Sequence, residues 1–316
     1  MKKMKAIRVY EFGDTEQLKY EEIDIPVPKD EEVLIKVYYA GVLPIDFKIR
    51  QGKFGKRKFP YTPGIAASGV IEEIGKDVVG FKVGEAVFGR TKRGAYKEYA
   101  TIPIKNLNHK PKQLTFEDAA TITAGAEAAW EALFSKGELK EGQRVLIHGA
   151  SGGVGQFAVQ LAKWKGSEVI GTASSKNQTF LKKLGVDQAI DYTAKSFEKE
   201  VAKVDLVVDL IGGDTQNKSW SVIKPGGKLV SLIDIDETAA EDYPLVTAIF
   251  SQASPTLEEL DKLSDLMANG TIKSGIGAIF PLNQVREATK KCETRHGRGR
   301  ILLKISGHEK SRINVF

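Results

Sequence analysis

The feature that most constrains the fold of this chain is a glycine-rich segment, Gly149-Ala150-Ser151-Gly152-Gly153-Val154-Gly155. It follows the apolar residues 145–147 and opens a stretch in which Val154, Ala158 and Leu161 share one helical face. A strand, a glycine turn and a helix in this order are typical of the start of a dinucleotide-binding βαβ unit. Glycines let the backbone approach a pyrophosphate, whose charge then meets the free N–H groups of the helix start. A tight turn without a ligand is the alternative, but such a turn does not need so many glycines.

Short apolar segments alternate with helical ones after this loop. Strands are predicted over residues 144–148, 168–172, 189–191, 206–210 and 228–233. Such alternation indicates a parallel sheet covered by helices on both faces. A further strand over residues 301–305 could extend this sheet or return to the first part of the chain.

The region before residue 115 has a different pattern. Its short segments are rich in β-branched and aromatic residues and are separated by Gly, Pro and Asp, which is typical of an all-β domain. A capping-box pair, Thr115 and Asp118, then starts a helix, and Ala-rich sequence continues to Phe134. We therefore expect an α/β protein with an N-terminal β domain and a doubly wound parallel-sheet domain.

Composition narrows the class of protein. The chain has 316 residues, of which 41% are apolar and 28% charged, so we expect one large or two medium globular domains. Cys292 is the single cysteine, which excludes an internal disulfide and predicts a reducing, cytoplasmic location. No window has the apolar length of a membrane span. The net charge of +6 includes a basic run over residues 53–58, but a solvated loop explains that run, and no nucleic-acid partner is expected.

The turn after the second predicted strand indicates which dinucleotide is bound. The ribose end of such a site falls about 20 residues beyond the glycine loop, and Ser174 lies 19 residues after Gly155. Ser174, Ser175 and Asn177 can donate hydrogen bonds there, and Lys176 adds a positive charge. No carboxylate lies between residues 172 and 180, which favours NADPH over NADH. The alternative is that these residues only cap the next helix.

Several motifs together give the chain a family resemblance. They are Gly41-Val42-Leu43-Pro44-Ile45-Asp46-Phe47-Lys48, Phe59-Pro60-Tyr61-Thr62-Pro63-Gly64, Gly94-Ala95-Tyr96-Lys97-Glu98-Tyr99, the glycine loop, Ile190-Asp191-Tyr192, Asp209-Leu210-Ile211-Gly212-Gly213 and His296-Gly297-Arg298-Gly299-Arg300. With them the chain resembles the medium-chain dehydrogenase/reductase superfamily, and most of all its zinc-free branch of NADPH-dependent quinone and enone reductases. The resemblance implies a GroES-like β-barrel-type catalytic domain from residues 1–120 and 275–316, and a Rossmann domain from residues 121–274. It assigns the last strand to the first domain and implies a homodimer.

The zinc dehydrogenases of this superfamily carry ligands that this chain lacks. A Cys of those enzymes corresponds to the region of Leu43, and their Gly-His-Glu corresponds to Gly64, Ile65 and Ala66. Zinc needs thiolate, imidazole or carboxylate ligands, which these side chains do not supply. The four histidines are scattered without ligand spacing. We expect no metal site.

The resemblance also implies cofactor-binding residues. It places the pyrophosphate on Gly152, Gly153 and Val154 and the 2′-phosphate on Ser174, Ser175, Lys176 and Asn177, with Tyr192 at the same end of the cofactor. Leu232 flanks the nicotinamide through its backbone, and Arg298 and Gly299 reach the cofactor from the C-terminal segment. Arg300 stands where relatives often carry Lys.

Lys48 is the candidate catalytic residue. Hydride addition to an enone develops negative charge on the carbonyl oxygen, which a fixed cation stabilises. Lys48 could instead relay a proton through water, bind the cofactor, or be an exposed lysine. Asp46 could pair with Arg50 or cap a turn. The sequence thus predicts a zinc-independent, NADPH-dependent reductase of quinones or α,β-unsaturated carbonyls. The alternative is a catalytically idle NADPH-binding protein with a structural or RNA-binding role.

Overall fold

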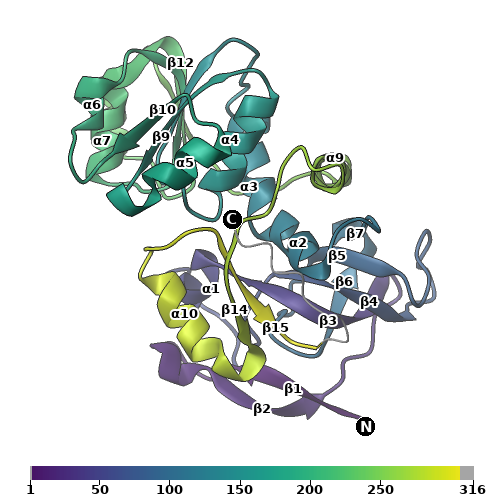
Figure 1. The fold of residues 1–316 in the computed structure, drawn as a ribbon. Coiled ribbons are helices and arrows are strands. Elements are labelled where there is room, and N and C mark those ends of the chain that lie inside the picture. The colour runs from purple at the N-terminus through teal and green to yellow at the C-terminus, as the bar shows by residue number, and fades with distance from the viewer. Residues whose placement is uncertain (1, 307–316) are drawn as a thin grey trace.

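Two large β-sheets organise the chain, of which the computed structural model describes residues 2–306. Figure 1 shows a helix-covered parallel sheet in its upper part and a second sheet below it. A two-stranded ribbon, β1 (Lys3–Arg8) and β2 (Lys19–Asp24), lies at the lower edge. The predicted α/β class with two kinds of sheet is confirmed.

The upper sheet has six strands, all parallel, in the order β10-β9-β8-β11-β12-β13. Its strands are β8 (Arg144–Ile147), β9 (Glu168–Ala173), β10 (Gln188–Asp191), β11 (Val204–Asp209), β12 (Ile223–Ser231) and β13 (Thr247–Phe250). Counted from β8, this is the doubly wound order 3-2-1-4-5-6 of a dinucleotide-binding Rossmann sheet. The order reverses between β8 and β11, where such sheets bind their ligands.

Alternate residues of β8 pack against opposite helical layers, because successive side chains of a strand point to opposite faces. Val145 and Ile147 are fully buried in the cluster that contains α4 (Gly155–Trp164) and α9 (Leu257–Ala268). Leu146 is buried on the other face, in the cluster that contains Phe197 and Trp220. Each such side chain contributes roughly 1.5–3 kcal/mol to folding. Among residues 2–306, none of the helices is long and apolar enough to cross a membrane.

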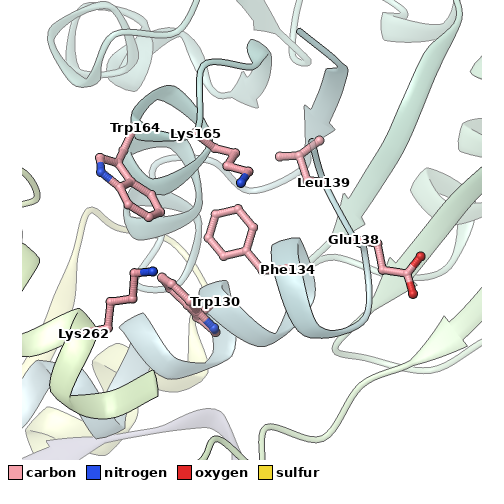
Figure 2. A pocket seen from close by; sticks show the side chains of 7 residues that line it. All are labelled: Trp130, Phe134, Glu138, Leu139, Trp164, Lys165 and Lys262. Carbon is pink, nitrogen blue, oxygen red and sulfur yellow. The ribbon is translucent and has the colours of Figure 1, made fainter. Parts of the chain in front are cut away.

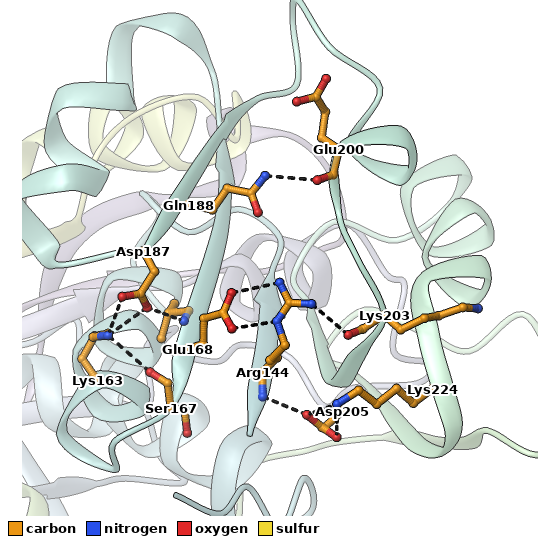
Figure 3. Close-up of polar contacts among 11 residues, drawn as sticks. Arg144, Lys163, Ser167, Glu168, Asp187, Gln188, Glu200, Lys203, Asp205 and Lys224 are labelled. Atoms are coloured by element: carbon orange, nitrogen blue, oxygen red, sulfur yellow. Dashed lines mark hydrogen bonds and ion pairs between the residues drawn. The ribbon is translucent and has the colours of Figure 1, made fainter. Parts of the chain in front are cut away.

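Charged side chains hold the amino-terminal edge of this sheet (Figure 3). Arg144 donates two hydrogen bonds to Glu168, at 2.8 and 2.9 Å, and thereby joins the first residues of β8 and β9. The backbone N–H of Arg144 donates to Asp205 at 2.8 Å. Lys163 on α4 pairs with Asp187 at 2.8 Å. These contacts fix the strand spacing at the edge opposite the glycine loop.

The lower sheet has seven strands. Its path is β14-β15-β3-β4-β5-β7, and β6 pairs with β3 beside this path. The strands are β3 (Glu32–Val42), β4 (Ala66–Ile74), β5 (Ala86–Arg90), β6 (Tyr99–Pro103), β7 (Leu107–His109), β14 (Ile276–Pro281) and β15 (Arg300–Lys304). The register of β15 places Ile301 opposite Val42. The C-terminal strand therefore lies in the sheet of the N-terminal strands (Figure 1).

The helical stretch between the sheets is interrupted. It comprises α2 (Phe116–Thr121), the π-helical turn η3 (Ile122–Ala126), α3 (Glu127–Trp130) and the π-helical turn η4 (Glu131–Ser135). The predicted capping box of Thr115 and Asp118 is present at its start. Gly125 has non-helical angles (φ 176°, ψ −47°), and a Cβ there would lie 2.4 Å from Nε of Arg300. The side chain of Arg300 thus occupies the space that a side chain at position 125 would need.

Candidate functional site

The glycine loop lies between β8 and α4, at the carboxyl end of the sheet. Gly149 has φ +65°, a value that favours glycine. A Cβ on Gly155 would lie 2.3 Å from the carbonyl oxygen of Gly149, so only glycine lets α4 start this close to β8. The N–H groups of Gly153 and Val154 precede the first turn of α4, where backbone donors have no intrahelical acceptor. The structure therefore places phosphate-binding groups at the switch point of the sheet.

The C-terminal segment reaches this loop, as the sequence predicts for Gly299. Gly299 forms an isolated β-bridge with Gly152, and its N–H donates to the carbonyl of Ser151 at 3.1 Å. Arg298, the residue before Gly299, contacts an aromatic ring. Its guanidinium carbon lies 4.6 Å from the centre of the Phe180 ring on α5 (Gln178–Leu184).

Arg300 is a site residue that the sequence analysis noted but did not assign. It is 7% exposed, and Cβ atoms added to Gly125 or Gly153 would lie 2.4 and 2.6 Å from its Nε. Within the described residues this Nε has no hydrogen-bond partner. Burial lowers the pKa of Arg300 to about 10, although Cys292 and Glu127 act in the opposite direction. A buried cation thus lies directly against the phosphate-binding loop.

Residues 174–177 form a turn at the carboxyl end of β9. The side chains of Ser174 and Asn177 make no capping hydrogen bond, so the capping alternative does not explain them. Lys176 is exposed and forms no ion pair with the described part of the chain. Tyr192 lies beside the turn, since its N–H donates to the carbonyl of Ala173 at 3.3 Å. Its side chain is half exposed, so it is not an ordinary packed core side chain.

A carboxylate that the sequence analysis missed also lies at this turn. The hydroxyl of Ser175 donates to Oδ2 of Asp191 at 2.5 Å. Asp191 ends β10, which pairs in parallel with β9 and places Asp191 opposite Ala173. The sequence pattern could have indicated this contact, because the predicted strand that ends at Asp191 follows the one before Ser174, and the carboxyl ends of neighbouring parallel strands meet at one edge of a sheet. Asp191 lies 18 residues after the end of β9 and therefore outside the segment that directly follows that strand.

Lys48, the candidate catalytic residue, has electrostatic neighbours from several segments of the chain. It belongs to α1 (Pro44–Arg50), on the side of the lower sheet. Burial lowers its pKa, as do the nearby cations Arg295 and Lys53, whereas Asp234 raises it. Asp234 follows β12 two residues after Leu232, whose N–H donates to the carbonyl of Asp209 at 3.0 Å. Lys48 is therefore within electrostatic reach of Asp234, three residues beyond the end of β12.

Asp46 caps a helix turn and does not pair with Arg50. Its Oδ2 accepts the N–H of Leu43 at 2.9 Å and the hydroxyl of Tyr96 at 2.8 Å. Burial raises the pKa of Asp46 to about 6, even though these hydrogen bonds favour its ionised form. Arg50 instead pairs with Glu293 on α10 (Val285–Glu293). Of the two expectations for Asp46, the turn cap is the one that the structure contains.

No group of three or more His, Cys, Asp or Glu residues within the described chain could hold a metal ion. Leu43 and Ile65, which stand where zinc enzymes of the superfamily have ligands, lie in an apolar cluster with Ala66 and Ala124. His148 is buried between the hydroxyls of Thr172 and Ser219.

An aromatic hollow of about 310 Å³ lies elsewhere on the Rossmann side (Figure 2). Trp130, Phe134 and Trp164 form its floor, and the ammonium of Lys262 lies 5.6 and 5.5 Å from the centres of the two indoles. Trp164 is the last residue of α4, whereas the glycine loop is at the first. The hollow is therefore separate from the site at the carboxyl end of the sheet.

A Rossmann sheet with a glycine loop at its switch point, together with a second sheet that returns residues to that loop, defines a dinucleotide-dependent oxidoreductase. Two family models match the chain: the alcohol dehydrogenase GroES-like domain over residues 29–112 and the zinc-binding dehydrogenase over residues 184–303. The chain belongs to the medium-chain dehydrogenase/reductase superfamily, in its quinone oxidoreductase branch.

Individual relatives agree with this assignment. The chain is 34% identical to the chloroplastic NADPH-dependent alkenal/one oxidoreductase of Arabidopsis thaliana, over 96% of this chain and 80% of that protein. It is similar to the solved structure of the Coxiella burnetii quinone oxidoreductase, with a TM-score of 0.91, 35% identity, and coverage of 96% and 100%. The Escherichia coli quinone oxidoreductase, solved in complex with NADPH, gives a TM-score of 0.89 and 26% identity, with coverage of 95% and 99%. The protein is thus an oxidoreductase that binds a nicotinamide cofactor.

Proposed function

We propose that this oxidoreductase is a zinc-independent reductase that uses NADPH to reduce quinones or α,β-unsaturated carbonyls. The observation that carries the proposal is Arg300, a buried cation with an unpartnered Nε that lies against the glycine loop. Glu127 and Cys292, which attract Arg300, have pKa values raised by burial to about 8 and about 12, so both are uncharged at neutral pH and the guanidinium still needs an anionic partner. The names of the relatives support both substrate classes, quinones and alkenals or alkenones.

The residues around the loop fit a dinucleotide. A side chain at position 153 would clash with Arg300, and Gly153 avoids this clash. Backbone N–H groups of the loop and the guanidinium can therefore bind the same anion. Gly152 and Val154 complete the loop, and Gly299 closes over it from the C-terminal segment. We assign the pyrophosphate to these residues and Arg300, and we place Arg298 beside them, over α5.

The turn at residues 174–177 supports NADPH. Lys176 is an exposed cation with no carboxylate partner in the described chain, and Ser174 has a hydroxyl that no helix cap uses. Asn177 and Tyr192 lie beside them. A 2′-phosphate there would gain a charge-assisted contact that the hydroxyl of NADH cannot make.

Lys48 and Leu232 mark the reacting end of the site in this proposal. NADPH supplies a hydride when it is bound. The ammonium of Lys48 is placed to stabilise the negative charge that develops on a carbonyl oxygen of the substrate. The backbone at Leu232 flanks the nicotinamide position. Leu43, Ile65 and Ala66 offer no metal ligand at this end of the site, which supports a reaction without zinc.

The cofactor assignment is tested by steady-state kinetics with NADPH and NADH. The parent protein should prefer NADPH by at least tenfold in kcat/KM, and Lys176→Asp should remove this preference. Lys182→Asp is the matched control, because Lys182 is an exposed lysine on α5 outside the turn, and it should leave the preference intact. Equal use of NADPH and NADH by the parent would refute the assignment.

The reaction is tested with a panel of simple quinones and short enones. The parent should oxidise NADPH in the presence of at least one of them, and Lys48→Met should lower kcat for an enone about 100-fold, the usual size of the effect of losing one oxyanion donor. Tight NADPH binding without turnover of any substrate would instead favour the catalytically idle alternative.

We also propose the division of the chain into residues 1–120 with 275–316 and residues 121–274, supported by the pairing of β15 with β3. The proposed homodimer has a candidate surface in β13, the outermost strand of the six-stranded sheet, whose Phe250 is 46% exposed. Sedimentation of the protein tests the dimer. A cytoplasmic location stays a prediction.

A further inference from the structure

The turn proposed for the 2′-phosphate contains a carboxylate that changes what its hydroxyls can do. Oδ2 of Asp191 accepts the proton of Ser175 at 2.5 Å, and Oδ1 accepts from the hydroxyl and the N–H of Thr193 at 2.6 and 3.0 Å. Ser175 and Thr193 are themselves 3.0 Å apart. Hydrogen bonds from Ser175 and Thr193 lower the pKa of Asp191, so this carboxylate is ionised at neutral pH.

A serine hydroxyl has one proton to donate. Because Ser175 gives that proton to Asp191, its oxygen is left to act as an acceptor. A 2′-hydroxyl can donate to such an acceptor, whereas a phosphate of charge near −2 has no proton to offer at neutral pH. The bonded pair of Ser175 and Asp191 therefore suits the ribose of NADH better than that of NADPH.

The negative charge of Asp191 also favours the ribose of NADH over that of NADPH. A ligand oxygen that contacts Ser175 lies about 2.8 Å from its Oγ, and hence within roughly 5 Å of Oδ2 of Asp191. Like charges at this separation repel, and the exposed position weakens the repulsion without removing it. Lys176, one residue beyond Ser175, attracts the same phosphate. The turn thus combines one group that favours the phosphate with one that opposes it.

We infer that Asp191 is a specificity-determining residue that reduces the preference of the site for NADPH and retains NADH as a usable cofactor. This inference rests on the proposed function, since it concerns the same cofactor site. In this interpretation Lys176 creates the preference for NADPH, and Asp191 makes that preference smaller.

The experiment measures dissociation constants of 2′,5′-ADP and 5′-ADP, two fragments that differ only in the 2′-phosphate. Asp191→Asn removes the charge but keeps the shape, and it should shift the ratio of the two constants about tenfold toward 2′,5′-ADP. Thr193→Val removes one hydrogen bond to Asp191 but keeps the carboxylate, and it should shift the ratio less than threefold. In 0.5 M NaCl the effect of Asp191→Asn should fall below about threefold, because salt screens an exposed charge.

Two results would overturn the inference. One is a ratio that Asp191→Asn leaves within twofold of the parent. The other is an equal weakening of both fragments, which would show that the carboxylate only maintains the turn. With either result, binding of NADPH to the parent protein, measured by the fluorescence of NADPH, would still support the proposed function. Absence of NADPH binding by the parent would instead refute the proposed function itself.

Discussion

His148 should make the stability of the fold fall with acid. It directly follows β8 and is 1% exposed. Its Nε2 lies 2.9 Å from the hydroxyl oxygen of Ser219, which donates its own proton to the carbonyl of Thr215 at 2.6 Å. Ser219 must therefore accept from Nε2–H, and Thr172, 3.1 Å away, donates to Nδ1. The hydrogen bonds thus match a neutral imidazole.

The size of the effect follows from the pKa. Burial lowers the pKa of His148 from 6.5 to about 4, although Asp209 raises it. The unfolded chain therefore binds a proton between these two values that the folded chain does not bind, and stability is lost as the pH falls below 6.5. Linkage gives a loss of about 2 kcal/mol from this group between pH 7 and pH 5.

Urea unfolding of the parent and of His148→Gln at pH 7 and pH 5 measures this loss. Gln keeps a donor for Ser219 and does not titrate, so the difference in unfolding free energy between the two proteins should change by about 2 kcal/mol between the two pH values. The same two proteins at pH 7 and pH 8 are the control, because His148 is neutral in both the folded and the unfolded chain above its ordinary pKa of 6.5, and their difference should change there by less than about 0.5 kcal/mol. Parallel pH dependence of parent and His148→Gln would refute the reasoning.

Other substitutions test the polar groups near the site. Burial raises the pKa of Glu127 to about 8, so the folded carboxyl retains a proton that the unfolded one loses above pH 4.5, and stability declines as the pH rises to 8. Glu127→Gln should gain stability relative to the parent between pH 5 and pH 8 in urea unfolding, and an unchanged difference would contradict this. Glu293→Gln leaves Arg50, 1% exposed, without its charged partner and should cost about 3–5 kcal/mol in the same assay, whereas a cost below 1 kcal/mol would argue against the pair. Gly153→Ala brings a Cβ within 2.6 Å of Nε of Arg300 and should weaken NADPH binding about tenfold in a fluorescence titration, and equal affinity would show that the loop can shift.

Local signals accounted for most of the Rossmann sheet. The strands predicted at residues 144–148 and 168–172 are observed as β8 and β9, each within one residue, because apolar runs bounded by glycine and charge are local features. The turn after β9 was located by its offset from Gly155. β12 begins five residues earlier than predicted, because it includes the Pro-Gly-Gly segment from Ile223, and it ends at Ser231, two residues before the predicted end.

The contacts that complete the site are not local, and this is why the sequence did not reveal them. The need for glycine at position 125 depends on Arg300, which lies far from it in the sequence. The role of Asp191 depends on strand pairing, since a residue on β10 reaches the turn after β9 only when the two strands are adjacent. In contrast, the cap formed by Asp46 spans three residues and was among the expected alternatives.

The pairing of β15 with β3 has a consequence for biosynthesis. During translation the residues of β8 to β13 leave the ribosome as one continuous segment, followed by α9, which covers one face, so the parallel sheet can form before β15 is made. The lower sheet lacks β15 until residues 300–304 emerge, and Arg300 arrives with that strand. The glycine loop is thus synthesised before its buried cation, which is added only with β15. Nascent chains should therefore acquire the fold of the parallel sheet before they acquire full affinity for the cofactor.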